Sequence, residues 1–101
     1  MTSTDPARRL HLNLFGNWHG NHRAAWRHPK VDPHQVWDLD FCVRVAQLGE
    51  RGLFDAIFFA DGPGGPDLHP GAGQTKPDPL ILLAGIASAT EHIGLAATVS
   101  T

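Results

Sequence analysis

The stretch FDAIFFAD at residues 54–61 decides the fold, because after Asp55 it is apolar without any alternation. A half-buried strand alternates apolar and polar residues, whereas a short continuous apolar run is typical of a parallel strand covered on both faces. Asp61 ends the run and Gly62 follows it. We therefore predict a buried strand over residues 54–60, with Asp61 at its carboxyl end.

Two other segments have the composition of strands. Residues 10–15 read LHLNLF, an alternating pattern that ends at Gly16, and residues 93–99 form a second continuous apolar run, IGLAATV. The stretches at 16–31 and 62–76 lack an apolar period, and the second is rich in Gly and Pro, so both are predicted to be long loops. Ser100 and Thr101 then lie at the carboxyl tip of the third strand.

Two helices are predicted between these strands. Asp32-Pro33 has the residues of a helix start, so the first helix is expected from residue 32 to about residue 51, with Gly52 as its cap. Asp78-Pro79 repeats this device, and the second helix is expected to run to about residue 91, closed by His92. Spacings of three and four place the buried stripe of the first helix at Trp37, Phe41, Val45 and Leu48, widened by Leu39, Cys42, Val43 and Ala46.

The order strand, helix, strand, helix, strand predicts an α/β fold whose parallel strands are joined by right-handed crossovers. Two crossover helices on one side leave the other face of the sheet bare and both edge strands unpaired. A TIM (β/α)8 barrel covers such surfaces only when all eight units are present, in roughly 250 residues. We therefore expect residues 1–101 to form one incomplete domain with strands one to three of a barrel, poorly folded on its own.

The composition disfavours several classes of partner. Of the 101 residues, 42% are hydrophobic and 18% are charged, and the formal net charge of -2 provides no positive field for nucleic acid or an anionic membrane. The polar start and the short apolar runs predict neither a secretory signal nor a membrane span. Cys42 is the single cysteine, which gives no disulfide framework, so we expect a cytoplasmic location and a buried Cys42.

Four blocks of the sequence, in order, resemble a known family: LNLF at 12–15, AWRHP at 25–29, FDAIFFAD at 54–61 and ATEHIGLAATVST at 89–101. They are similar to the bacterial-luciferase-like flavin-dependent monooxygenases, in the branch of the nitrilotriacetate and dibenzothiophene-sulfone monooxygenases. The resemblance covers nearly the whole chain and fades between residues 62 and 76. It implies the N-terminal part of a TIM (β/α)8 barrel.

The resemblance also implies an activity and its partners. A separate flavin reductase would supply reduced FMN, which the barrel enzyme uses with dioxygen to add one oxygen atom to a small organic substrate. Family members are expected to be homo-oligomers at full length. The flavin carries the dioxygen chemistry, while the protein positions the ring, excludes water and admits the substrate.

Three residues are implied as flavin-contacting positions: Asp61, Thr98 and Ser100. They end the second and third strands, where barrel enzymes have their sites, and a carboxylate and hydroxyls suit the N–H donors and carbonyl acceptors of a flavin ring. Taken without the family, Asp61 is a solvated residue capping a turn with Gly62, and the two hydroxyls are ordinary strand ends. No catalytic residue is assigned.

Three other motifs give weaker evidence about function. His19, His22 and His28 share a loop, but no Cys or carboxylate completes a zinc spacing, so no metal site is predicted. The block AWRHP is interpreted as a loop that packs against the barrel mouth, with Trp26 as its anchor and Arg27 facing an anion. The segment GAGQTK at 71–76 lacks the pattern of a phosphate loop.

Three hypotheses for the function follow. The first is the N-terminal fragment of an FMN-dependent monooxygenase. The second is a non-catalytic truncated remnant, or a half-barrel that needs a complementing chain. The third is a small flavin- or nucleotide-binding module, which FMN titration of the 101 residues would test.

Overall fold

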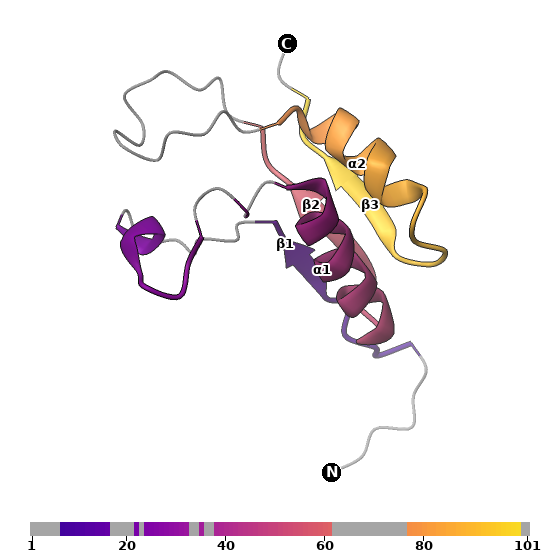
Figure 1. The fold of residues 1–101 in the computed structure, drawn as a ribbon. Coiled ribbons are helices and arrows are strands. Elements are labelled where there is room, and N and C mark those ends of the chain that lie inside the picture. Colours follow the sequence, from indigo (N-terminus) through magenta and orange to yellow (C-terminus); the bar gives the residue numbers. More distant parts are fainter. Residues whose placement is uncertain are drawn as a thin grey trace.

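The computed structural model describes residues 7–16, 22, 24–32, 35, 38–61 and 77–99. Their elements, in chain order, are β1 (Asn13–Phe15), the 3-10 helix η1 (Ala25–Arg27), α1 (Leu39–Arg51), β2 (Ala56–Phe59), α2 (Pro79–Ala87) and β3 (Gly94–Ala97). The strands form one parallel sheet in the order β1-β2-β3. Figure 1 shows α1 and α2 on the same side of this sheet. The predicted α/β fold with parallel strands in the order β-α-β-α-β is confirmed.

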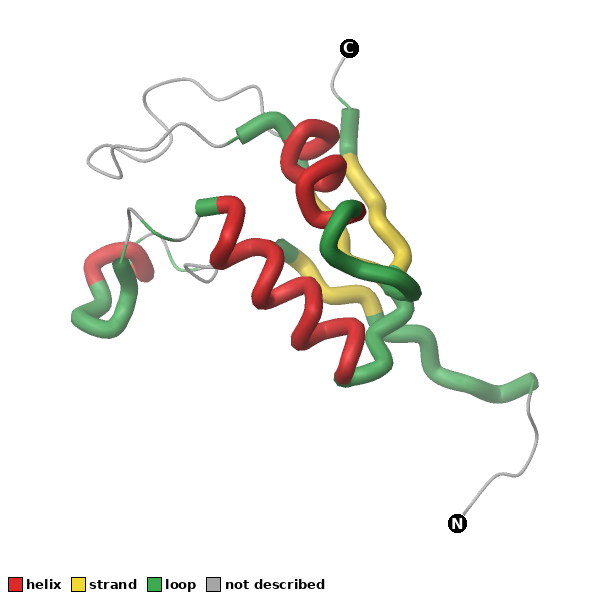
Figure 2. Tube along the Cα trace, turned by 45° about the vertical axis from the view of Figure 1, so that its right-hand side comes forward, coloured by secondary structure: helices red, strands yellow, loops and turns green. Residues whose placement is uncertain are grey.

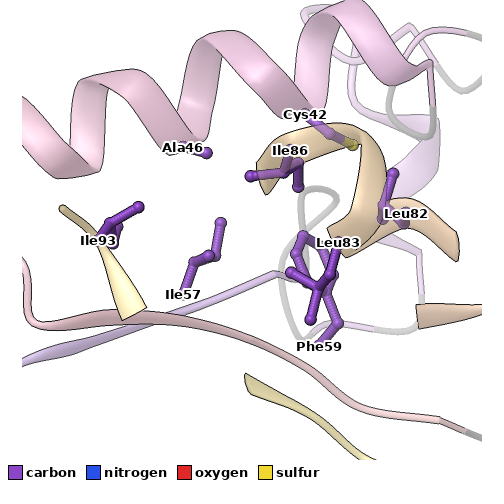
Figure 3. Close-up of a cluster of buried hydrophobic side chains, with 8 residues drawn as sticks. All are labelled: Cys42, Ala46, Ile57, Phe59, Leu82, Leu83, Ile86 and Ile93. Carbon is purple, nitrogen blue, oxygen red and sulfur yellow. The ribbon is translucent and has the colours of Figure 1, made fainter. Parts of the chain in front are cut away.

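One face of the sheet packs against the two helices. Successive side chains of a strand point to opposite faces, and in β2 the buried residues are Ile57 and Phe59, two positions apart. They meet buried residues of both helices and of the segment before β3 (Figure 3). The core consists of Cys42, Ala46, Ile57, Phe59, Leu82, Leu83, Ile86 and Ile93. Cys42 is buried, as predicted from the sequence.

The opposite face of the sheet is open. In the part of the chain that the structure describes, α1 and α2 both lie on the other side of the strands (Figure 2), and no further α-helix is present to cover this face. The face carries the rings of Phe15 and Phe58, which stack with their centroids 5.5 Å apart. Phe15 is 46% exposed. The bare face predicted from the strand order is therefore present.

The start of α1 differs from the prediction. The helix begins at Leu39, with Asp38 in extended backbone before it, and not at Asp32. The Gln35 amide donates to the Asp32 carbonyl and the Asp38 amide donates to the Gln35 carbonyl. Each bond joins residues three apart and not the four of an α-helix, so the described residues Asp32 and Gln35 are not part of α1.

The buried stripe of α1 was predicted in part. Cys42 and Ala46 are buried as expected, whereas Leu39 is 46% and Leu48 60% exposed, and the third buried residue is Gly49. A Cβ atom at Gly49 would lie 3.2 Å from the Leu14 side chain, so small residues here let the helix approach the sheet closely. Phe41 and Val45 are half-buried, and the predicted position Trp37 lies outside the described residues.

Helix α2 begins as predicted and ends earlier. Oδ1 of Asp78 accepts hydrogen bonds from the amides of Leu80, at 2.9 Å, and Ile81, at 3.3 Å. The helix ends at Ala87 instead of residue 91, because the hydroxyls of Ser88 and Thr90 donate to carbonyls of the last turn, Gly85 and Ile86. His92, predicted to close this helix, lies in the loop before β3.

The strands are shorter than the predicted 10–15, 54–60 and 93–99, and each lies inside its predicted segment. Residue 53, in the turn before β2, is a leucine with φ of 62°. None of the described helices has the length and apolar character needed to cross a membrane.

Candidate functional site

The carboxyl ends of the three strands meet at one edge of the sheet. The Gly16 amide donates to the Phe58 carbonyl at 2.8 Å, and the Thr98 amide donates to the Phe59 carbonyl at 3.0 Å. The parallel hydrogen bonding thus continues one residue beyond β1 and β3. Asp61 follows Phe59 by two residues, so the backbone places Asp61 and Thr98 at the same edge, on neighbouring strands.

The side chains at this edge differ in environment. Thr98 is exposed, and because Ala97 packs against the core on the helix-covered face, alternation directs the next residue, Thr98, to the open face. Asp61 is half-buried. Ser100, the third predicted flavin contact, lies outside the described residues. The structure therefore brings two of the three predicted positions to one edge, and their role as flavin contacts stays a prediction.

The loop after β1 carries η1. Here the Arg27 guanidinium lies over the Trp26 ring, 5.0 Å from its centroid, and Trp26 is half-buried. The imidazole Nδ1 of His22 accepts a hydrogen bond from the Ala24 amide, and that of His28 accepts one from the Lys30 amide. These two histidines thus stabilise local turns. Within the described ranges, no three His, Cys, Asp or Glu side chains gather as a metal site would require.

Two carboxylates at the amino end of the sheet were missed by the sequence reasoning. Oδ2 of Asp55 accepts from the Leu12 amide at 2.8 Å, and its Oδ1 lies 3.2 Å from Nδ1 of His11. The pKa of the Asp55 carboxyl is lowered, first by the hydrogen bond from the Leu12 amide and next by the hydrogen bond from His11. This carboxylate ties the segment before β1 to the start of β2.

Glu50 ties the end of α1 to the start of β3. Its Oε1 accepts the amides of three consecutive residues, at 2.8 Å from Glu91, at 3.0 Å from Ile93, and from His92 between them. The bonds from His92, Ile93 and Glu91, in decreasing order, lower the pKa of the carboxyl. An acidic side chain in the last turn of a helix is disfavoured by the helix dipole. The position of Glu50 was therefore a sequence signal that its carboxylate bonds to a group outside the helix.

These two anchors lie away from the carboxyl edge of the sheet. In a (β/α)8 barrel the chemistry lies at the carboxyl ends of the strands, whereas the amino ends contribute to folding. Glu50 and Asp55 both act at the amino ends, on the opposite edge from Asp61 and Thr98. The candidate site is therefore the carboxyl edge together with the adjoining part of the open face.

Comparisons with known proteins agree with this geometry. No family model matches the chain. It is 35% identical over 105 residues to the long-chain alkane monooxygenase of Geobacillus thermodenitrificans, covering 93% of this chain and 24% of that protein. It is 30% identical over 106 residues to nitrilotriacetate monooxygenase component A of Aminobacter aminovorans, covering 93% of this chain and 23% of that protein.

A solved structure has the same fold. The crystal structure of long-chain alkane monooxygenase aligns with a TM-score of 0.73 and 32% sequence identity, over 91% of this chain and 24% of that chain. The chain thus spans about a quarter of the length of the relatives it matches. Its strands correspond to the opening part of a TIM barrel.

Because Glu50 is bonded as a carboxylate, we expect the stability of the fold to depend on pH. The test protein is a fusion of residues 1–101 to the part of the Geobacillus alkane monooxygenase that follows the segment matched by this chain; it is called the fusion below. A folded-state pKa below the ordinary 4.5 contributes stability that is present above that pH and is lost as the pH falls through the folded value. Glu50→Gln should therefore lower the urea midpoint at pH 7, and its difference from the unsubstituted fusion should shrink below about pH 4.5.

A matched control is available three residues before β3. Glu91 has an 85% exposed side chain and a 3.8 Å contact to His92, so Glu91→Gln should leave the midpoint nearly unchanged. A Glu50→Gln difference that is the same at pH 7 and pH 3 would contradict an ionised anchor.

Proposed function

Because this chain is a homologue of the luciferase-like monooxygenases over their N-terminal region, we propose that it forms the first three strand-helix modules of an FMN-dependent monooxygenase. In this proposal a separate flavin reductase supplies reduced FMN in the cytoplasm, and the full-length enzyme is a homo-oligomer. Reduced FMN supplies the reaction with dioxygen by which a small organic substrate gains one oxygen atom. This chain contributes one part of the flavin site.

The observation that carries the proposal is the shared edge of Asp61 and Thr98. A flavin ring presents both N–H donors and carbonyl acceptors, so a carboxylate that accepts and a hydroxyl that donates suit its polar rim. Asp61 is half-buried, which reduces the competition of water for its oxygens, and Thr98 projects to the open face. We propose that these two residues orient the ring and that the covered strands exclude water beneath it.

The experiment measures FMN binding by the fusion, with oxidised FMN followed by fluorescence and with reduced FMN under anaerobic conditions. Asp61→Asn and Thr98→Val keep the shape of each side chain and remove one hydrogen-bonding function. Each should weaken FMN binding by about ten- to a hundredfold if the bond is buried in the complex. Asp40→Asn, an exposed carboxylate in the first turn of α1, is the control and should have no effect.

Two results would count against the proposal. A folded fusion that binds no FMN would show that these strands do not complete a flavin site. If both Asp61→Asn and Thr98→Val leave the FMN affinity unchanged, these two residues do not contact the flavin. The 101 residues alone should leave FMN fluorescence unquenched, and quenching would support the small flavin-binding module instead.

A chain without catalysis of its own is the second candidate, and the open sheet face favours it. Among the described residues, no further strand pairs with the outer edges of β1 and β3, and the rings of Phe15 and Phe58 lie on the open face. A half-barrel would offer these surfaces to a complementing chain. The DNA that follows the codon of Thr101 distinguishes the two candidates. An in-frame continuation with further strand-helix units supports the enzyme, and a stop codon supports the half-barrel or a remnant.

A further inference from the structure

The backbone that leads into β3 is held by two side chains of α1. Nε2 of Gln47 donates to the carbonyl of Ala89 at 3.1 Å. Oε1 of Glu50 accepts the amides of residues 91–93, the last three before β3. Gln47 and Glu50 are three residues apart, so they lie on the same side of α1 near its end. Because every partner is a backbone group, α1 fixes the path of the chain here whatever side chains the loop carries.

The side chains of β3 define its position against β2 only weakly. The strand reads GLAA, and none of its four residues is fully buried. On the helix-covered face, Leu95 pairs with Ile57 and Ala97 pairs with Phe59. If β3 slid by two residues, Ala97 and Val99 would take these places, and the covered face would stay apolar. A strand whose hydrophobic pattern fits two positions equally has a weakly specified register.

Two features of the packing oppose this slide. Ile93, directly before the strand, belongs to the core. A Cβ atom at Gly94 would lie 2.9 Å from the carbonyl oxygen of Asp55, so Ala96 would be crowded in that place. Glu50 adds an attractive interaction, since its carboxylate meets all three amides in the observed register. Hydrogen bonds to a charged group of this kind are stronger than those between neutral groups.

The position of Thr98 depends on this register. Its amide donates to the Phe59 carbonyl at 3.0 Å, which places Thr98 at the carboxyl edge, one strand away from Asp61. A parallel strand advances about 3.3 Å per residue, so a slide of two residues would move Thr98 by about 6–7 Å along the sheet. That displacement is longer than a hydrogen bond, and Thr98 would no longer share the edge with Asp61.

We propose that Glu50 is a positioning residue for the candidate site: by holding the three amides before β3, it fixes the register of β3 and thereby the place of Thr98. The consequence for flavin binding rests on the proposed function, whereas the register does not. Three consecutive amides that converge on one oxygen form a small anion site. In Glu50→Ala, free acetate should therefore occupy the same amides, a rescue that a residue of general stabilising effect gives no reason to expect.

The first test measures the register of β3 without flavin. Phe58 and Ala96 are Cα partners, so Phe58→Cys with Ala96→Cys, in a fusion whose other cysteines are replaced by alanine, should be joined by the short thiol cross-linker dibromobimane. Adding Glu50→Ala should slow this cross-linking about three- to tenfold, and acetate, but not the neutral acetamide, should restore it. Glu50→Gln keeps one acceptor oxygen and should have an intermediate rate, and it replaces Glu50→Ala if that variant does not fold. Asp55→Ala removes the carboxylate that ties the segment before β1, so it is the matched control and should leave the rate unchanged.

A second pair of cysteines reports the alternative register. Phe58→Cys and Thr98→Cys would be aligned only after the slide of two residues, so Glu50→Ala should speed their cross-linking. If Glu50→Ala leaves both pairs unchanged, Glu50 does not set the register and the inference is wrong. It is also wrong if the loss of cross-linking at Phe58 and Ala96 is not reversed by acetate.

The second test measures FMN affinity and separates this inference from the proposed function. Because Glu50 acts through Thr98, Glu50→Ala should weaken FMN binding by no more than Thr98→Val does, and the double variant should be no weaker than Thr98→Val. Combined with Asp61→Asn, on the neighbouring strand, the effect of Glu50→Ala should add. Additive losses with Thr98→Val would refute the positioning role. If the fusion binds no FMN, or if Thr98→Val binds it normally, the proposed flavin contact fails, and cross-linking still decides whether Glu50 sets the register.

Discussion

The 101-residue chain on its own should show no cooperative thermal transition and no native-like near-UV circular dichroism. Among the described residues, ten large hydrophobic side chains are exposed and only eight hydrophobic residues form the core. Helix α2 contains no polar side chain between Pro79 and Ala87, yet Leu80 and Ile81 are exposed. A helix that is apolar all round needs cover on every side. The missing cover lies on the open face, on both edges and on α2.

Adding the remaining part of the Geobacillus protein as a separate chain should restore both signals. The expected change is from a featureless melt to a single transition, because the added strands pair with the free edges and fill the open face. Phe58→Asp should prevent this recovery by placing a charge against the new interior, whereas Ala24→Asp at an exposed position should not. A sharp transition of the 101 residues alone would show that three strands suffice and that the open face needs no partner.

The parallel sheet could be predicted because its signals are local. The continuous apolar run around Ile57 distinguishes a strand covered on both faces, and Asp78-Pro79 forms its cap within three residues. The start of α1 was wrong for a related reason. Asp32-Pro33 has the same two residues as Asp78-Pro79 and an apolar period follows both pairs, so the sequence does not show that α1 begins only at Leu39.

The packing of α1 required information from other elements. Its large residues suggested a stripe through Leu48, but close approach to Leu14 favours the side where Gly49 has no Cβ. The sequence alone ranks residues by size and polarity, whereas the sheet selects the face that fits.

The candidate site was partly predictable. That Asp61 and Thr98 share an edge follows from strand direction alone, and the backbone has this arrangement. The anchors at the other edge were not predicted because their partners are distant in sequence. Glu50 bonds to amides 41 to 43 residues away, and Asp55 bonds to Leu12, 43 residues away. A lone carboxylate beside a strand does not reveal which amides it accepts.

Gly16→Ala should destabilise the fusion by about 1–3 kcal/mol, because the added methyl group would enter the core from the end of β1. A Cβ atom there would overlap with Cε1 and Cδ1 of the Phe59 ring. The Phe59 ring is fully buried among residues of both helices, so it has no space to move aside (Figure 3). The change is measured as the shift in the free energy of unfolding in urea.

A double-mutant cycle tests that this one contact is the cause. Phe59→Leu removes the ring atoms that the new methyl group would meet, so the double variant should be more stable than the sum of the single changes by about 0.5–3 kcal/mol. Gly52→Ala is the control, since its nearest contact would be 3.3 Å to the Leu48 carbonyl, and combined with Phe59→Leu it should be additive within about 0.5 kcal/mol. Additivity in the Gly16 cycle would mean that the end of β1 shifts to admit the methyl group. In that case the position of Gly16 against Phe59 would not be fixed by packing, and the carboxyl edge that carries the candidate site would be free to move with it.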